Sequence, residues 1–140
     1  MTEVLQSLPA DHQLYAEIVN RYKNMMSSLL EYQAESGMWR QLVDNKLSWE
    51  ETSCSAMFAY AMAAGVHNGW LDDVQYESAV QKAWKALRDK LDPQGNLPDV
   101  CAGTGQKNDV EYYLNRPRTK GDLHGQAPFL WLACELMENQ

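Results

Sequence analysis

The chain has 140 residues, of which 45% are hydrophobic, and its 12 Lys and Arg against 19 Asp and Glu give a formal net charge of −7. A domain of this length can bury about 68% of the surface of its unfolded chain, so length alone permits one independent core. The acidic balance, without any run of Lys and Arg, argues against a protein that binds nucleic acid through its phosphates.

The N-terminal residues and the cysteines limit where the chain works and what it binds. Met1–Gln6 lacks the basic start and apolar core of a secretory signal, and no stretch approaches the roughly 20 apolar residues of a membrane span. We therefore expect a cytoplasmic protein without nucleic-acid or membrane partners. Cys54, Cys101 and Cys134 are far apart and outside any C-x-x-C pattern, which predicts free thiols rather than disulfides or a zinc site. No metal and no cofactor are expected.

The first long helix is predicted after Asp11, a plausible N-cap, and should end at Ser36-Gly37, where Gly can adopt a left-handed cap. Its apolar residues recur at spacings of three and four: Leu14, Ile18, Tyr22, Met25, Met26, Leu29 and Leu30. Since the remaining positions are polar, this helix should be amphipathic and lie on the outside.

The second helix has a different character. It begins at Glu50–Ser53, whose acids and hydroxyls suit a helix N-terminus, and runs through Ala56–Ala64 without a polar face before it ends in Gly65–Gly69. A helix that is apolar all round is expected to be buried all round.

The third and fourth helices repeat this pair. The third, from Asp72 or Asp73 to about Leu91, has a one-sided apolar stripe, so it should be an outer helix. A turn at Asp92–Gly95, short extended pieces and a polar loop from Ala102 to about Gly121 follow. The fourth helix, with Pro128 in its first turn, again reads as buried.

The alternation of outer and buried helices predicts an all-α fold of helical hairpins, the arrangement of a two-layer toroid. Two hairpins are too few to close a ring. Val4, Leu5 and Leu8 resemble the last two turns of another amphipathic helix, and a helix that short is marginal alone. We hypothesise that the chain is part of a larger fold or pairs with other protein, since its buried helices would otherwise expose apolar patches.

Two loops carry the residues best suited to a site. Each precedes one of the buried helices, so both are expected at the same end of the toroid. They contain aromatic rings that could stack on a sugar, cations that could pair with its carboxylate, and groups that could bond its hydroxyls. The candidates for substrate contact or for support of the site are Trp39, Gln41, Thr52, Ser53, Arg116 and His124.

Structural roles explain several of the same residues equally well. Trp39 and Trp49 could be loop anchors, Glu51-Thr52-Ser53 a helix cap, and Asp122 the cap of the fourth helix. His124 is the best candidate among the three histidines. No Ser-His-Asp order, phosphate loop or metal-ligand spacing is present, and the sequence identifies no catalytic residue.

These loops and helix starts also carry a family resemblance. The motifs that carry it are Gly37-Met38-Trp39-Arg40-Gln41, Glu51-Thr52-Ser53-Cys54-Ser55-Ala56-Met57-Phe58-Ala59-Tyr60-Ala61, Val100-Cys101-Ala102-Gly103-Thr104-Gly105, Tyr112-Tyr113, Arg116-Pro117 and Asp122-Leu123-His124-Gly125-Gln126-Ala127-Pro128. With these motifs in this order, the sequence resembles the C-terminal part of the unsaturated rhamnogalacturonyl hydrolases, glycoside hydrolase family 105, which are related to family 88.

The resemblance implies an incomplete (α/α)6 toroid, with residues 1–140 as the C-terminal portion of one toroid domain and no second domain. It implies an unsaturated uronyl oligosaccharide as substrate, whose C4=C5 double bond an aspartic acid protonates before water adds at C5. That aspartate belongs to the family's N-terminal half, so no residue here inherits its role and the chain alone should be inactive. The partner is then the missing half or a second copy. The alternative is a non-catalytic module of half a toroid that binds sugar or protein.

Overall fold

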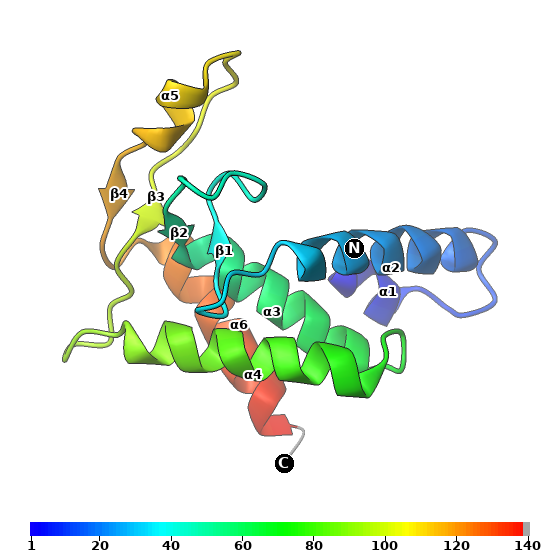
Figure 1. Ribbon diagram of the computed structural model, residues 1–140. Helices are drawn as coiled ribbons and strands as arrows, with labels where there is room; N and C mark the ends of the chain where they lie inside the picture. Colours follow the sequence, from blue (N-terminus) through cyan, green and yellow to red (C-terminus); the bar gives the residue numbers. More distant parts are fainter. Residues whose placement is uncertain (139–140) are drawn as a thin grey trace.

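The computed structural model describes residues 1–138, except for the side chain of Asp73. Within these residues six helices carry the fold (Figure 1), and four two-residue strands lie in the segments between α2 and α3 and between α4 and α6. The helices are α1 (Thr2–Ser7), α2 (Tyr15–Glu31), α3 (Thr52–His67), α4 (Asp73–Asp89), α5 (Val110–Leu114) and α6 (Leu123–Glu138). The all-α prediction is confirmed.

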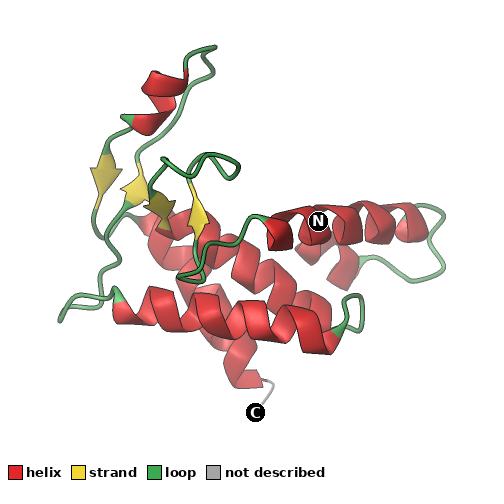
Figure 2. Cartoon of the chain, viewed as in Figure 1, coloured by secondary structure: helices red, strands yellow, loops and turns green. Residues whose placement is uncertain are grey.

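The four strands form two short antiparallel pairs. Strand β1 (Trp39–Arg40) pairs with β2 (Glu50–Glu51), and β3 (Val100–Cys101) pairs with β4 (Arg118–Thr119). Figure 2 shows all four strands gathered at one side of the helical body. Because β2 leads directly into α3, and β4 leads into α6 through one turn, both pairs fix the N-terminal ends of these two helices.

Helix α3 is at the centre of the molecule, in contact with α6, α4 and α2. Its sequence explains this position, because nine of its residues are buried and small alanines allow neighbouring helices to approach. Helices α2 and α4 bury only one face each, as their apolar stripes predicted. The alternation of one-sided and largely apolar helices is therefore confirmed for α2, α3 and α4.

Helix α6 departs from the expectation that it is buried all round. Phe129 and Leu132 are buried, whereas Leu130 and Trp131 on its other side are 60% and 55% exposed. The described residues leave this side of α6 largely open. The exposed apolar surface agrees with the hypothesis of a larger fold or a partner.

The predicted helix boundaries need three corrections. Helix α2 begins at Tyr15 rather than after Asp11, and it ends at Glu31, five residues before Ser36. Residues 110–114, expected in a loop, form α5. Helix α6 already begins at Leu123, so Pro128 is its sixth residue rather than in its first turn, and His124 is helical. Because proline has no N–H to donate to the carbonyl four residues earlier, α6 forgoes one hydrogen bond near its N-terminus.

Candidate functional site

The N-terminal ends of α3 and α6 meet at a buried carboxylate. Glu51, 3% exposed, is the N-cap of α3, and its side chain accepts hydrogen bonds from three donors. The backbone N–H of Cys54 donates to Oε2 at 2.5 Å, and the backbone N–H of Cys101 donates to Oε1 at 2.9 Å. Ser53 Oγ lies 2.8 Å and 2.9 Å from the two carboxylate oxygens. Glu51 thereby joins α3 to β3.

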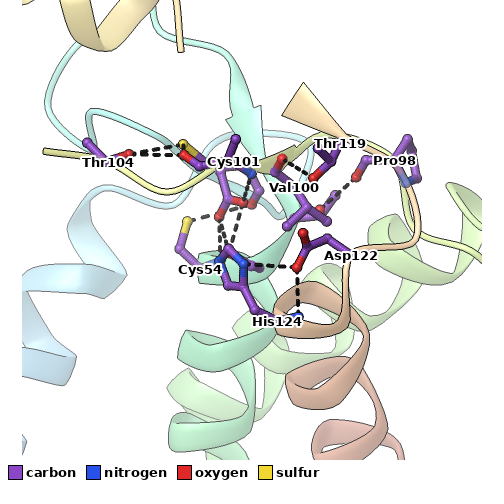
Figure 3. Close-up of polar contacts among 12 residues, drawn as sticks. Cys54, Pro98, Val100, Cys101, Thr104, Thr119, Asp122 and His124 are labelled. Carbon is purple, nitrogen blue, oxygen red and sulfur yellow. Dashed lines mark hydrogen bonds and ion pairs between the residues drawn. The ribbon is translucent and has the colours of Figure 1, made fainter. Parts of the chain in front are cut away.

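His124 extends this network to α6. Its ring Nε2 lies 3.3 Å from Ser53 Oγ, and its Nδ1 lies 3.2 Å from Asp122 Oδ1. Figure 3 shows the contact between Asp122 and His124, close to Cys54 and Cys101. The four side chains of Glu51, Ser53, His124 and Asp122 form one continuous chain of polar contacts, which we call the Glu51 network.

Close backbone packing holds the start of α6 in this position. Gly125 lies in the first turn of α6, and a Cβ added to it would overlap with Val100 of β3. The side chain of Gln126 also accepts from the Leu97 N–H at 2.8 Å and donates to the Gly95 carbonyl at 2.9 Å. The turn and strand before the long loop are therefore fixed against α6.

Thr52 and Ser53 are the first two residues of α3 and also belong to the candidate site. Thr52 has no exposed surface, and its hydroxyl donates to the Pro98 carbonyl at 2.7 Å, while its N–H donates to the Asp99 carbonyl at 3.2 Å. Asp99 has a φ of 54°, a left-handed conformation uncommon for a residue other than glycine. Such conformations are found preferentially at functional sites, which singles out this segment.

Trp39 is buried too deeply for its ring to stack on a ligand. It has no exposed surface, its Nε1 donates to the Leu29 carbonyl at 2.6 Å, and its ring meets Phe58 edge to face at 5.7 Å. These contacts fit the role of loop anchor. Its backbone N–H donates to Ser55 Oγ at 2.8 Å, which ties β1 to the first turn of α3.

Gln41 and Trp49 lie together on the other side of the α3 N-terminus. Both are half-buried, and the Gln41 N–H donates to the Trp49 carbonyl at 3.0 Å. Gln41 Oε1 and Trp49 Nε1 are buried atoms without a hydrogen-bond partner within the described residues. The guanidinium of Arg118 lies 4.5 Å from the centre of the Trp49 ring, a cation–π contact.

Arg116 supports the long loop between β3 and β4, an arm that projects from the helical body (Figure 1). Its guanidinium donates to the carbonyls of Ala102 and Gly103 and lies 4.8 Å from the centre of the Tyr112 ring. The Tyr112 hydroxyl in turn accepts from the Gly105 N–H at 3.0 Å. These contacts make Arg116 a support of the arm, and its buried Nε has no hydrogen-bond partner within the described residues.

The structure thus brings Thr52, Ser53 and His124 together at one end of the helices, as the two-loop hypothesis expected. It places Gln41 beside Trp49, Arg116 in the arm and Trp39 in the interior. The sequence analysis considered Glu51 and Asp122 only as helix caps. Glu51 precedes Ser53 by two residues, and Asp122 precedes His124 by two residues. An acid at that spacing is the signal that could have identified Glu51 and Asp122 from the sequence.

Two further structural findings concern metals and membranes. Among the residues that the structure describes, no three His, Cys, Asp or Glu side chains are grouped to hold a metal ion. Within the same residues, none of the helices combines the length and apolar character needed to cross a bilayer.

The whole chain, residues 1–140, matches the model of Glycosyl Hydrolase Family 88. The chain belongs to this family. The family resemblance expected from the loop motifs is confirmed.

Curated relatives of the family support the same assignment. An unsaturated 3S-rhamnoglycuronyl hydrolase of Formosa agariphila is 40% identical over 96 residues, which cover 67% of this chain and 26% of the relative. An unsaturated rhamnogalacturonyl hydrolase of Bacillus subtilis is 27% identical over 140 residues, covering 100% of this chain and 39% of the relative. The chain therefore spans about a quarter to two fifths of the length of these relatives.

The fold matches solved structures of the family. The crystal structure of a possible member of family GH105 from Salmonella enterica superposes with a TM-score of 0.91 at 27% identity. The match covers 99% of this chain and 36% of that chain. The helical hairpins described above are thus part of the toroid fold of families 88 and 105.

Proposed function

We propose that the chain forms one wall of the substrate pocket of a glycoside hydrolase that acts on a terminal unsaturated uronyl residue of pectin-derived oligosaccharides. The observation that carries the proposal is the Glu51 network at the joined N-terminal ends of α3 and α6. It places polar groups of two helices at one end of a family 88 fold. The names of the two curated relatives support an unsaturated uronyl substrate, and that of the Bacillus subtilis relative a rhamnogalacturonyl one.

In this proposal the chain binds and positions the sugar. His124, whose side chain is 49% exposed, is the most exposed group of the network, and a ligand that reaches it also meets Asp122, 40% exposed. Ser53 lies behind His124, and the buried Thr52 and Trp39 support the loops around it. Gln41 lies at the half-buried Trp49, an aromatic ring of the kind that stacks on sugars. Arg116 acts by shaping the arm beside the pocket.

We also propose that the general acid comes from outside these 140 residues. By the family resemblance, an aspartic acid protonates C4 of the C4=C5 double bond and water adds at C5. The resulting hemiketal opens and releases the neighbouring sugar. No residue of this chain is assigned to that proton transfer. The partner of the chain in this proposal is the remainder of a toroid. The chain and this remainder form one domain, which we place in the cytoplasm.

The test is an absorbance assay with an unsaturated rhamnogalacturonyl disaccharide, since hydration of the double bond removes its ultraviolet absorbance. The 140-residue chain is expected to leave the absorbance unchanged. The same chain extended by the coding sequence upstream is expected to remove it. Turnover by the 140 residues alone would contradict the missing acid, and an upstream sequence without the remaining helices and an aspartate-bearing loop would contradict the whole proposal.

A second function is favoured by the exposed apolar side of α6. Leu130 and Trp131 would suit a non-catalytic module of half a toroid in which two copies rebuild a ring. Sedimentation distinguishes the two proposals. The module should be a stable dimer that binds uronyl oligosaccharides without turnover, whereas a monomer that gains activity only when extended supports the enzyme.

A further inference from the structure

The order of contacts Ser53–His124–Asp122 invites comparison with a nucleophilic triad, in which a serine donates its hydrogen to histidine. The distances here favour a different direction. Ser53 Oγ is 2.8 Å and 2.9 Å from the Glu51 carboxylate but 3.3 Å from His124 Nε2. A hydroxyl has one hydrogen, and a carboxylate is the stronger acceptor, so Ser53 donates to Glu51.

This direction determines what the His124 ring must do. With its hydrogen committed to Glu51, Ser53 offers only lone pairs to the ring, so Nε2 must be the donor of the 3.3 Å contact. On the other side, Asp122 Oδ1 also accepts only, so a hydrogen bond at 3.2 Å requires a hydrogen on Nδ1 as well.

We propose that Glu51 is a positioning residue that acts through Ser53 to hold His124 as a doubly protonated ring. Glu51 fixes the direction of the Ser53 hydroxyl, and Ser53 fixes the hydrogen on Nε2. The half-exposed ring is then presented to the ligand as an oriented cation, in keeping with a uronate substrate. This last step rests on the proposed function, whereas the state of the ring does not.

Glu51 has a second connection that makes the arrangement specific to this site. The same carboxylate accepts the Cys101 N–H at 2.9 Å, at the end of β3 from which the arm departs. One buried side chain therefore sets both the hydrogen on His124 and the anchor of the arm. A residue that served only to cap α3 would need only the Cys54 N–H.

The substitution E51Q tests the proposal because it keeps the shape of the side chain and replaces one acceptor oxygen with an NH2 donor. That NH2 also loses the backbone N–H of Cys54 or Cys101, so S53A is the decisive variant. The amide NH2 of glutamine can donate to Ser53, which then turns its own hydrogen toward His124 Nε2. Nε2 must then lose its hydrogen and become the acceptor, with Nδ1–H still donating to Asp122. E50Q is the matched control, since Glu50 is the adjacent carboxylate and its Oε1 contacts Ser36 instead.

The readout is the long-range proton–nitrogen NMR spectrum of the histidine rings of the full chain at neutral pH, without substrate. The three rings are distinguished with H124Q. We expect a hydrogen on Nε2 of His124 in the wild type and in E50Q, and its loss in E51Q. S53A removes the relay and keeps the bond from the Cys54 N–H to Glu51 that caps α3, and it is likewise expected to remove the hydrogen on Nε2.

An Nε2 resonance that is the same in wild type, E51Q and S53A, in chains whose circular dichroism shows them folded, would overturn the proposal. If E51Q does not fold, S53A alone decides between the two outcomes. Because no turnover is measured, failure here leaves the proposed function standing, and failure of the absorbance assay leaves the state of the ring standing.

Discussion

A single oxygen of Asp122 holds both the backbone and the ring of His124. Oδ1 accepts from the His124 N–H at 3.0 Å and lies 3.2 Å from Nδ1 of the ring. The backbone N–H of His124, the largest cause, lowers the pKa of Asp122 below its ordinary value, and the ring of His124 adds to this. The carboxylate therefore favours the folded state while it is ionised.

This relationship predicts a pH dependence for D122N. A carboxyl whose pKa is lowered by folding stabilises the protein at pH values above its unfolded pKa, about 3.9. That stabilisation is lost as the pH falls through the lower pKa of the folded state. Thermal unfolding should show D122N less stable than the wild type at neutral pH, with the gap closing in acid. D44N, at an exposed carboxylate, is the control, and a gap independent of pH would contradict the prediction.

Because Trp39 is buried, we expect even the conservative substitution W39F to lower the free energy of unfolding. W39F removes the Nε1–H that donates to the Leu29 carbonyl, which keeps the Tyr32 N–H at 3.1 Å, and it replaces a fully buried ring with a smaller one. The free energy of unfolding should fall by about 1–3 kcal/mol. Urea unfolding measures it, with W131F as the control, because Trp131 is 55% exposed and such changes cost within about 0.5 kcal/mol. Equal effects of the two substitutions would show that Trp39 is not an anchor.

The contact between α6 and β3 predicts the effect of G125A. Alanine normally stabilises a helix over glycine by about 1 kcal/mol, but here the added Cβ meets Val100. We expect overpacking to destabilise the chain by about 1–3 kcal/mol, measured by thermal or urea unfolding. G103A is matched to it, since no atom lies within 4 Å of a Cβ added there. A stabilised G125A would mean that α6 and β3 are not in close contact.

The three thiols should react in a defined order. Burial, with the charge of Glu51 as the next cause, raises the pKa of the Cys54 thiol far above its ordinary value, so the reactive thiolate is scarce. Cys134 is exposed on α6. Alkylation of the native chain followed by peptide mass spectrometry should modify Cys134 first and Cys54 only after unfolding.

The same labelling reports on what covers α6. Protection of Cys134 at high protein concentration, but not after dilution, is expected if copies associate through this side. Cys101, half-buried in β3, serves as the internal reference. Rapid modification of native Cys54 would contradict the packed N-terminus of α3.

Hydrophobic spacing predicted the long helices well because burial of an apolar face is a property of residues near in sequence. The stripe of α4 and the apolar run of α3 read directly as one-sided and central helices. Boundaries were less predictable. Helix α2 ends at Glu31 although Ser36-Gly37 carries a stop signal, and Gly37, with a φ of 95°, instead lets the chain pass against the backbone of Lys82 on α4.

The candidate site, like the fold, was predictable from the sequence only in part. The residue types around Ser53 and His124 were reason enough to consider both, and the loop motifs identified the family that the whole-chain match confirms. Sequence could not decide which candidates were interior, because Trp39 and Trp49 have the same chemistry in one loop. Only packing against Phe58 and the Leu29 carbonyl makes Trp39 an anchor.

The sequence by itself determined the helical class, the family and the two loops that lead into α3 and α6. Tertiary structure alone decided that these loops meet at Glu51, because 50 residues separate it from Cys101 and 71 separate Ser53 from His124. No local pattern encodes the direction of a hydrogen bond between such distant groups. The chain packing sets that direction, since it brings the single hydrogen of Ser53 nearer to a buried carboxylate than to the imidazole ring.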